Sequence, residues 1–409
     1  MENRQIKFLF SIGMICTAFL SGSLLLNGCG DNTADELPLG EVNEAPPEVS
    51  EQTFSEEPVP PETEDSTEEE PETETSLPII ETRKTVDGKI QSYLTGEWLD
   101  KDKAERRPIA VMIPNNAPAM PQYGLSKASI IYEAPVEGRI TRLMAVFEDY
   151  DELDHIGPIR SSRDYFVYVA MGYEAIYCNW GLARPYVEEL LSRDTVQNIS
   201  AAVVGIHNPS DEAFGRINRP GYATEFTGYL FIDGLEKAVK RQKYETNYDD
   251  DYVPPFTFVD DGFCAGYEEE KDAVAIYPGG RTANQGGYGV YNPYFEYNEK
   301  DRLYYRYQDG KKQIDEYDNS QLAVSNVVFQ YCHGEVRDKK DYLAFGVHGE
   351  GKALVFTNGK VIEGTWERYD GDATPAKFYD KNGDEIIFNQ GKTWICNIWD
   401  EYGEFVEWK

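Results

Sequence analysis

The chain has 409 residues, of which 73 are Asp or Glu and 39 are Lys or Arg, so its formal net charge is −34 at pH 7. A protein that binds nucleic acid needs a basic face to neutralise phosphates, and this acidic balance argues against nucleic acid as a partner. The length is sufficient for two domains with hydrophobic cores of their own, once the N-terminal segments described next are set aside.

The first 28 residues resemble the signal peptide of a bacterial lipoprotein. Arg4 and Lys7 supply positive charge, an apolar run extends over residues 8–26, and Gly28 precedes Cys29. In such proteins the cysteine becomes the first residue of the mature chain and carries the lipid. We therefore expect lipidation at Cys29 and an extracytoplasmic location, at the outer face of the cytoplasmic membrane. An uncleaved transmembrane anchor is the alternative, and it would also tether the chain to the membrane.

Residues 29–82 form an acidic linker rich in Pro, Glu and Thr. Between Gly30 and Thr82 there are eighteen Asp or Glu residues and no Lys or Arg. A segment of this composition has too little apolar surface to offset the loss of chain entropy on folding. We therefore expect it to be disordered, and extended by repulsion between its charges. Because residues 1–29 carry +1 and residues 30–82 carry −18, the remaining body carries −17. The linker is either a stalk that lifts this body off the membrane or a spacer without a selected reach.

Residues 83–245 alternate between apolar runs of strand length and helical patterns. The run Ile109-Ala110-Val111-Met112-Ile113 predicts a buried strand. Further strands are predicted over residues 128–133, 143–147 and 175–179. Helices are predicted over residues 161–170, 184–193 and 231–243, the first of them capped by Ser161 or Ser162. This alternation predicts a layered α/β domain.

Residues 246–409 have the pattern of a β-rich antiparallel domain. Strand-like runs occur at residues 273–277, 291–297, 303–307, 324–330, 353–357, 360–366, 385–389 and 393–398. Asp309-Gly310, Asn358-Gly359 and Asn382-Gly383 separate several of these runs, and such pairs favour tight hairpins. We expect a meander that closes into a sandwich or an open barrel. The predicted fold class is therefore α+β, an N-terminal α/β layered domain followed by a β-rich antiparallel C-terminal domain.

The cysteines and histidines of this body do not indicate a metal or redox centre. Cys178, Cys264, Cys332 and Cys396 are too far apart in sequence to form a zinc knuckle or a redox pair. The chain has four histidines, and none are paired at metal-binding spacing. We expect no metal and no cofactor, and buried free thiols rather than disulfides, although the sequence leaves a disulfide between two of these cysteines open.

Several short motifs together resemble one protein family. They include Arg107-Pro108-Ile109-Ala110-Val111, Tyr132-Glu133-Ala134, Val136-Glu137-Gly138, Ile140-Thr141-Arg142 and Gly157-Pro158-Ile159-Arg160-Ser161-Ser162-Arg163. These motifs resemble those of the YerB-type lipoproteins, and the resemblance covers about residues 88–400. It implies a lipoprotein of the Gram-positive envelope with two domains of unknown function, and it brings no known reaction. A His-Asn pair that the family pattern has before the last helix of the N-terminal domain is missing from residues 219–227, although His207 is near in sequence.

Charged residues that could bind a ligand are concentrated between positions 132 and 164. Arg160 and Arg163 flank the predicted start of a helix, where backbone N–H groups and the helix dipole favour an anion. Arginine adds a bidentate fork that suits carboxylate or phosphate. The candidate ligand-binding residues are Glu133, Glu137, Arg142, Arg160, Ser161 and Arg163. The ligand would be anionic or polyhydroxylated, such as a cell-wall glycan or a peptide stem. The alternative is an internal network in which Glu133 or Glu137 neutralises Arg142 or Arg160.

Two catalytic interpretations of the same residues are weaker. Glu133 and Glu137 could act as the acid and base of an envelope hydrolase that cleaves a glycan or peptidoglycan. Four positions apart on one strand, however, they would lie roughly 13 Å apart at Cα. Ser161 or Ser162 as a nucleophile would need a base, and His155 is the nearest in sequence. We therefore expect a membrane-anchored protein that binds an envelope ligand or protein partner, and we assign it no catalytic residue. The alternative is an envelope hydrolase with Glu133 and Glu137 as acid and base.

Overall fold

The computed structural model describes residues 77–201, 212–282 and 286–409. The predicted signal peptide, Cys29, most of the acidic linker and His207 lie outside the described residues. The end of the predicted linker is described, and there the Ile80 N–H donates to the Phe258 carbonyl at 2.9 Å. The folded body therefore begins before residue 83, and the described residues belong to one compact unit. Among the described residues, no helix is both long and apolar enough to cross a membrane.

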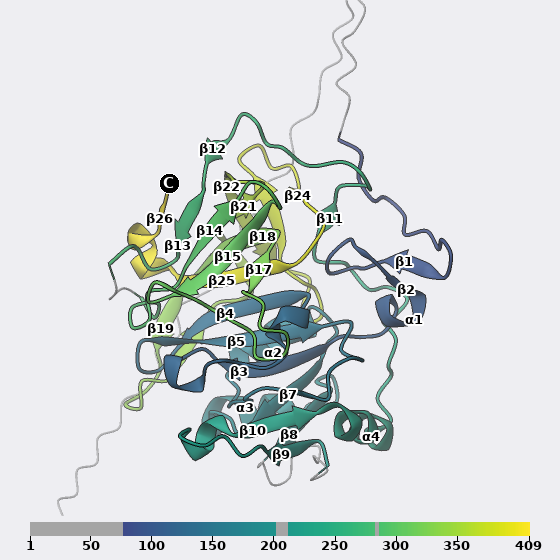
Figure 1. The fold of residues 1–409 in the computed structure, drawn as a ribbon, viewed down its shortest axis with the longest axis vertical. Coiled ribbons are helices and arrows are strands. Elements are labelled where there is room, and N and C mark those ends of the chain that lie inside the picture. The colour runs from purple at the N-terminus through teal and green to yellow at the C-terminus, as the bar shows by residue number, and fades with distance from the viewer. Residues whose placement is uncertain (1–76, 202–211, 283–285) are drawn as a thin grey trace, which may run out of the picture. The chain divides into compact units, whose positions relative to one another are not determined.

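An eleven-stranded mixed sheet runs through the described part of the chain (Figure 1). Its order is β12-β22-β21-β18-β25-β4-β5-β3-β7-β8, and β23 pairs with β22 as a branch. The bounds are β12 (Lys271–Asp272), β22 (Lys360–Arg368), β21 (Gly349–Thr357), β18 (Asn326–Cys332), β25 (Thr393–Trp399), β4 (Ile130–Val136), β5 (Ile140–Phe147), β3 (Ile109–Pro114), β7 (Ile176–Trp180), β8 (Asn198–Ala201) and β23 (Lys377–Asp380).

Strand β25 joins the two halves of the chain within this sheet. It runs parallel to β4, with Thr393 opposite Ile130 and Cys396 opposite Glu133, and parallel to β18 on its other side. The prediction of a purely antiparallel C-terminal half is therefore wrong at β25. Parallel neighbours need a long crossover, and the residues between β18 and β25 provide it. The boundary predicted near residue 245 does not coincide with a break in the sheet.

A second, six-stranded sheet has the order β16-β15-β14-β13-β26, with β17 beside β15. Its strands are β16 (Lys311–Lys312), β15 (Leu303–Gln308), β14 (Tyr294–Asn298), β13 (Ala275–Tyr277), β26 (Glu407–Trp408) and β17 (Ala323–Val324). Asp309-Gly310 turns β15 into β16 and Asn358-Gly359 turns β21 into β22, with all four residues at positive φ. These are the conformations of a type I′ turn, so the predicted hairpins at these two sites are confirmed.

Short strands and helices complete the described fold. Three two-stranded sheets pair β1 (Lys89–Gln91) with β2 (Trp98–Asp100), β11 (Thr257–Phe258) with β24 (Ile387–Phe388), and β19 (Gly334–Val336) with β20 (Leu343–Phe345). A three-stranded sheet has β10 (Gly228–Phe231) between β6 (His155–Ile156) and β9 (Phe214–Arg216). The helices are α1 (Lys101–Ala104), α2 (Asp164–Met171), α3 (Arg184–Leu191) and α4 (Ile232–Gln242), and the 3-10 turns are η1 (Ala117–Ala119), η2 (Leu125–Lys127), η3 (Thr224–Phe226) and η4 (Asp400–Phe405). The described fold is thus mixed but dominated by strands.

Helix α2 begins later than the sequence suggested. The residue before it, Arg163, has an extended backbone, and no side chain caps the first turn. The Ser162 hydroxyl, which was expected to cap, instead lies 2.7 Å from the Tyr177 hydroxyl in the protein interior. The predicted capping role is therefore wrong, because burial beside Tyr177 directs this serine away from the helix.

The large sheet has a hydrophobic core on each face. One core combines alternate residues of the central strands with α4 and the six-stranded sheet, for example Val111, Leu143, Leu235 and Phe295. The other combines the intervening residues with α2 and α3, for example Met112, Met144, Phe166 and Val187. Side chains that are adjacent in a strand therefore enter different cores. This separation determines which of the predicted site residues can lie close together.

The four described cysteines are free thiols. Cys178, Cys332 and Cys396 are buried in the two cores, as predicted, while Cys264 is partly exposed.

Candidate anion-binding site

The residues predicted to form one cluster lie on opposite faces of the sheet. In the β4–β5 hairpin, Glu133 pairs with Leu143 and Ala134 pairs with Arg142. Directly opposite residues share a face, and successive residues of a strand alternate. Glu133 therefore points towards the core that contains Leu143, and Arg142 towards the core that contains Ala134. The structure does not bring these two predicted site residues together.

Glu133 forms a fully buried ion pair with Arg306 of β15. The Arg306 Nη2 lies 2.9 and 2.7 Å from the two carboxylate oxygens, and both side chains are 0% exposed. Asn115 Nδ2 (2.9 Å), Thr141 Oγ1 (2.6 Å) and Trp394 Nε1 (2.9 Å) also donate to the carboxylate. This network links the two halves of the chain. The sequence did not indicate that Arg306, 173 positions further along the chain, is the partner of Glu133.

Glu137 and Arg163 form a second ion pair, on the side of the helices. Arg163 Nε donates to both carboxylate oxygens, at 2.9 and 3.2 Å, and its Nη2 bonds to the same carboxylate. Burial lowers the pKa of Arg163, but the hydrogen bond and the charge of Glu137 outweigh burial and raise it. The charge of Arg163 is thus neutralised by Glu137, which was among the candidate ligand-binding residues predicted from the sequence.

Arg142 is a nearly buried cation without a carboxylate partner of its own among the described residues. Its relative exposure is 6%, and its Nη1 donates to the Ser161 carbonyl at 2.6 Å. Burial, together with the nearby charges of Arg163 and Arg160, lowers its pKa to about 9. At neutral pH the Arg142 guanidinium therefore stays charged, although its burial and the neighbouring arginines make the charge unfavourable. Buried charges are normally paired, so an anion beside Arg142 would remove an unfavourable interaction.

Arg160 and Ser161 lie between two parallel strands of the sheet. The Arg160 N–H donates to the Met112 carbonyl of β3 at 2.8 Å, and the Trp180 N–H of β7 donates to the Arg160 carbonyl at 3.0 Å. The Arg160 guanidinium is partly exposed, and its nearest carboxylate in the described structure, Glu225, is 3.9 Å away. Burial lowers the pKa of Arg160. The charge of Glu225 opposes this shift, and the charge of Arg163 adds to it.

Arg142, Arg160 and Arg163, here called the arginine cluster, therefore converge near the carboxyl ends of β3 and β7. This end of parallel strands is where open α/β sheets commonly bind ligands. Three guanidinium groups face the two carboxylates of Glu137 and Glu225, so the cluster keeps an excess of positive charge within an acidic body. Such groups can bind a carboxylate or a phosphate through paired N–H donors.

Sequence reasoning missed two further features of this site. Arg216 stacks on the Trp180 ring, with its guanidinium carbon 4.7 Å from the ring centroid. Gly181 has φ +85°, and a Cβ there would lie 2.7 Å from the Ser161 hydroxyl oxygen. The one signal for the second feature was a glycine placed directly after an apolar strand, a position that often needs positive φ.

The described residues offer no metal centre or activated nucleophile at this site. Within the described ranges, no three His, Cys, Asp or Glu side chains are arranged to hold a metal ion. His155 stacks on Tyr123 with ring centroids 3.9 Å apart, and its Nδ1 lies 3.0 Å from the Asp154 carboxylate rather than beside Ser161 or Ser162. The arrangement is suited to binding an anion.

Comparison with known proteins identifies the family. Residues 94–245 match the family described as "Protein of unknown function (DUF3048) N-terminal domain", and residues 285–395 match its C-terminal domain. The Bacillus subtilis protein named "Putative lipoprotein YerB" is 28% identical over 313 residues, which are 75% of this chain and 86% of that protein. The chain belongs to the YerB-type family. This chain also matches the crystal structure of YerB protein from Bacillus subtilis, with a TM-score of 0.63 and 25% sequence identity. The match covers 78% of this chain and 98% of the chain in that crystal structure.

Both YerB-type domains contribute to the geometry described above. The arginine cluster lies within the segment matched by the N-terminal domain. The Glu133–Arg306 pair connects this segment to the one matched by the C-terminal domain. The arginine cluster therefore belongs to one matched segment, while the buried ion pair connects the two segments.

Proposed function

We propose that this protein is a lipid-anchored lipoprotein of the cell envelope that binds an anionic envelope ligand at the arginine cluster. The observation that carries the proposal is Arg142, a nearly buried guanidinium held by one backbone carbonyl and surrounded by two further arginines. A ligand carboxylate or phosphate would supply the missing counter-charge. The carboxylates of a cell-wall peptide stem and the acidic groups of an envelope glycan have this chemistry, as has an acidic patch of an envelope protein.

The proposed location rests on the sequence and on the relative. The pattern that ends at Cys29 predicts lipidation, and the name of the Bacillus subtilis relative describes that protein as a lipoprotein. A lipid at Cys29 would hold the body at the outer face of the cytoplasmic membrane, where envelope polymers are within reach.

The alternative of an envelope hydrolase has no specific observation in its favour. Glu133 is completely enclosed and bonded to Arg306, so substrate cannot reach it in this conformation. Glu137 is held by Arg163. The acid of a glycosidase must reach the leaving-group oxygen, and its partner carboxylate must reach the sugar or the attacking water, which an enclosed Glu133 cannot do.

Binding of soluble cell-wall fragments to residues 73–409, measured by calorimetry, tests the proposal. Arg160→Gln removes a partly exposed member of the cluster and should weaken binding about tenfold, the effect of losing one charge-assisted pair. Arg184→Gln is the matched control, because Arg184 is an exposed arginine on α3 that bonds to Glu188 of the same helix. Converting the carboxylates of the fragments to amides should abolish binding. Equal affinity of wild type and Arg160→Gln, or undiminished binding of the amidated fragments, would refute the proposal.

A further inference from the structure

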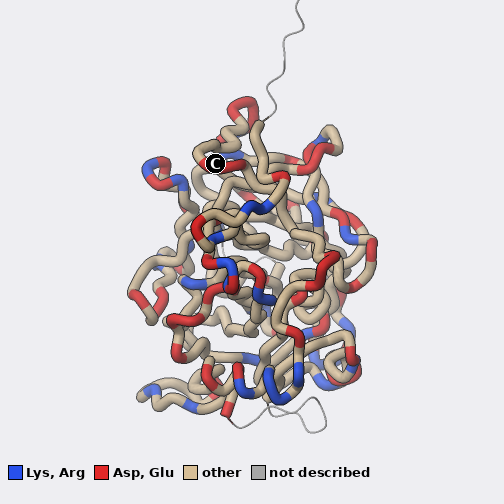
Figure 2. The backbone as a smooth tube through the Cα atoms, turned by 90° about the vertical axis from the view of Figure 1, so that its right-hand side faces the viewer, with Lys and Arg blue, Asp and Glu red and all other residues tan. Residues whose placement is uncertain are grey.

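Helix α4 gathers positive charge at one end of an otherwise acidic body. Lys237, Lys240, Arg241 and Lys243 are exposed, and none of them forms an ion pair with a carboxylate in the described part of the chain. Figure 2 shows several Lys and Arg positions, with Asp and Glu positions among them, at the lower end of the molecule, where Figure 1 labels α4. Cations near a helix C-terminus complement the helix dipole, which accounts for their position on the helix.

A cavity of about 510 Å³ lies beside this basic end of the helix. Its floor is apolar and includes Tyr150, Ile176, Leu235 and Val239, which are 7, 3, 1 and 8% exposed. The volume is within the range of small-molecule sites in proteins. A hollow with an apolar floor of this size can hold a hydrocarbon chain.

The margin of the cavity has an excess of positive charge. Arg106, Arg107, Lys240 and Lys243 line it together with one carboxylate, that of Glu236. The charge of Arg106 is matched by Asp151, 2.8 Å away. Lys240 and Lys243 lack such a match in the described structure, so they are the groups that can attract an anion to the margin of the cavity.

We propose that this cavity binds a single-chain anionic amphiphile, such as a fatty acid. The hydrocarbon chain lies on the apolar floor, and the acidic head group lies between Lys240 and Lys243. A free phosphate would leave the apolar floor uncovered, and an uncharged lipid would leave the two ammonium groups without a partner. A flat bilayer surface cannot reach apolar side chains that sit at the bottom of a hollow. The cavity is separate from the arginine cluster and does not depend on the function proposed there.

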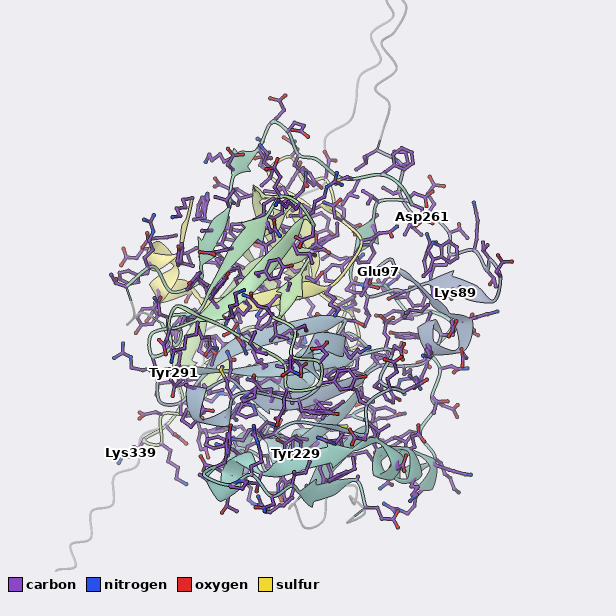
Figure 3. All side chains as sticks on the ribbon, viewed as in Figure 1. Lys89, Glu97, Tyr229, Asp261, Tyr291 and Lys339 are labelled. Carbon is purple, nitrogen blue, oxygen red and sulfur yellow. The ribbon has the colours of Figure 1, made fainter. Side chains whose placement is uncertain are left out.

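The test measures binding of octanoate, decanoate and dodecanoate to residues 73–409 by calorimetry, below the concentrations at which they form micelles. Affinity should rise about fourfold for each added methylene, the effect of burying one such group, until the cavity is full. The double variant Lys240→Glu, Lys243→Glu should bind decanoate about tenfold more weakly, and more so at low salt. Lys339→Glu is the control, because Lys339 is an exposed lysine distant from α4 in the view of Figure 3 and should leave affinity unchanged.

Two further measurements complete the test. Val239→Trp fills the cavity and should abolish binding of decanoate. If that variant fails to fold, the lysine double variant still decides, because both lysines are exposed. Equal affinity of the lysine double variant and Lys339→Glu overturns the inference, and so does decanol that binds as tightly as decanoate. Binding to anionic phospholipid vesicles without binding of decanoate also overturns it, and indicates a membrane-surface contact instead.

Discussion

Replacing Glu148 with glutamine should stabilise the protein, but only at neutral and alkaline pH. Glu148 follows β5 and is 0% exposed. Its Oε2 accepts hydrogen bonds from Ser92 Oγ at 2.5 Å and Ser129 Oγ at 3.0 Å, while its Oε1 is enclosed without a partner in the described structure. Burial raises the pKa of Glu148 from 4.5 to about 7, although the two serines and Arg83 act in the opposite direction.

The sign and size of the effect follow from this pKa. Between about pH 4.5 and pH 7 the folded protein holds a proton on Glu148 that the unfolded chain has released. Raising the pH through this window therefore removes stability. One pKa unit corresponds to about 1.4 kcal/mol, so the ionised carboxylate lowers the free energy of unfolding by about 3 kcal/mol above pH 7. The uncharged amide of Glu148→Gln avoids this loss.

Urea unfolding of wild type and Glu148→Gln at pH 5 and pH 8 measures the effect. The variant should gain about 3 kcal/mol relative to wild type at pH 8 and little at pH 5. Glu152→Gln is the control, because Glu152 is an exposed carboxylate whose pKa is lowered, chiefly by its hydrogen bond to Lys127, so its small effect should have the opposite sign. An equal difference between wild type and Glu148→Gln at the two pH values would refute the reasoning.

Three further predictions test the interior. Arg306→Met leaves the Glu133 carboxylate buried without its cation and should cost about 3–5 kcal/mol of unfolding free energy, and adding Glu133→Gln should recover part of this loss in urea titrations. Gly181→Ala forces a Cβ against Ser161 at positive φ and should cost about 1–2 kcal/mol, with weaker binding of cell-wall fragments, whereas a neutral result would contradict the geometry. A thiol reagent followed by peptide mapping should label Cys264 in the native protein, and the three buried cysteines of the described body only after denaturation.

Sequence patterns were informative where structure is local. The apolar run at residues 109–113 predicted β3, because all six residues of that strand are buried and continuous hydrophobicity is typical of a strand covered on both faces. The hairpins at Asp309-Gly310 and Asn358-Gly359 were predictable for a similar reason, since two residues at positive φ nearly specify the turn. Each of these inferences depends on neighbours within a few positions.

Long-range pairing was not predictable from the same patterns. Nothing in the residues of β25 indicates that it inserts between β18 and β4 and runs parallel to both. The partner of Glu133 follows from that insertion, because Arg306 reaches the carboxylate only when the six-stranded sheet packs on the face where β4 places it. A search for charged residues along the sequence therefore finds Glu133 and Glu137 but does not identify the arginines that pair with them, which are Arg306 and Arg163.

The pairing of charges distinguishes Glu133, which is paired inside the fold, from Arg142, which we propose binds a ligand. Glu133 has a cation and four other donors, so its charge is neutralised and hydrogen-bonded inside the fold. Arg142 lies nine positions later in the sequence, on the opposite face. It bonds to one backbone carbonyl, and the charges of Arg163 and Arg160 act against it while that of Glu137, which is bonded to Arg163, acts in its favour. Stability alone would favour an apolar residue at position 142, because an unneutralised buried charge is unfavourable. We infer that Arg142→Met stabilises the ligand-free protein and abolishes anion binding, and a variant that is destabilised and still binds would show that Arg142 is structural.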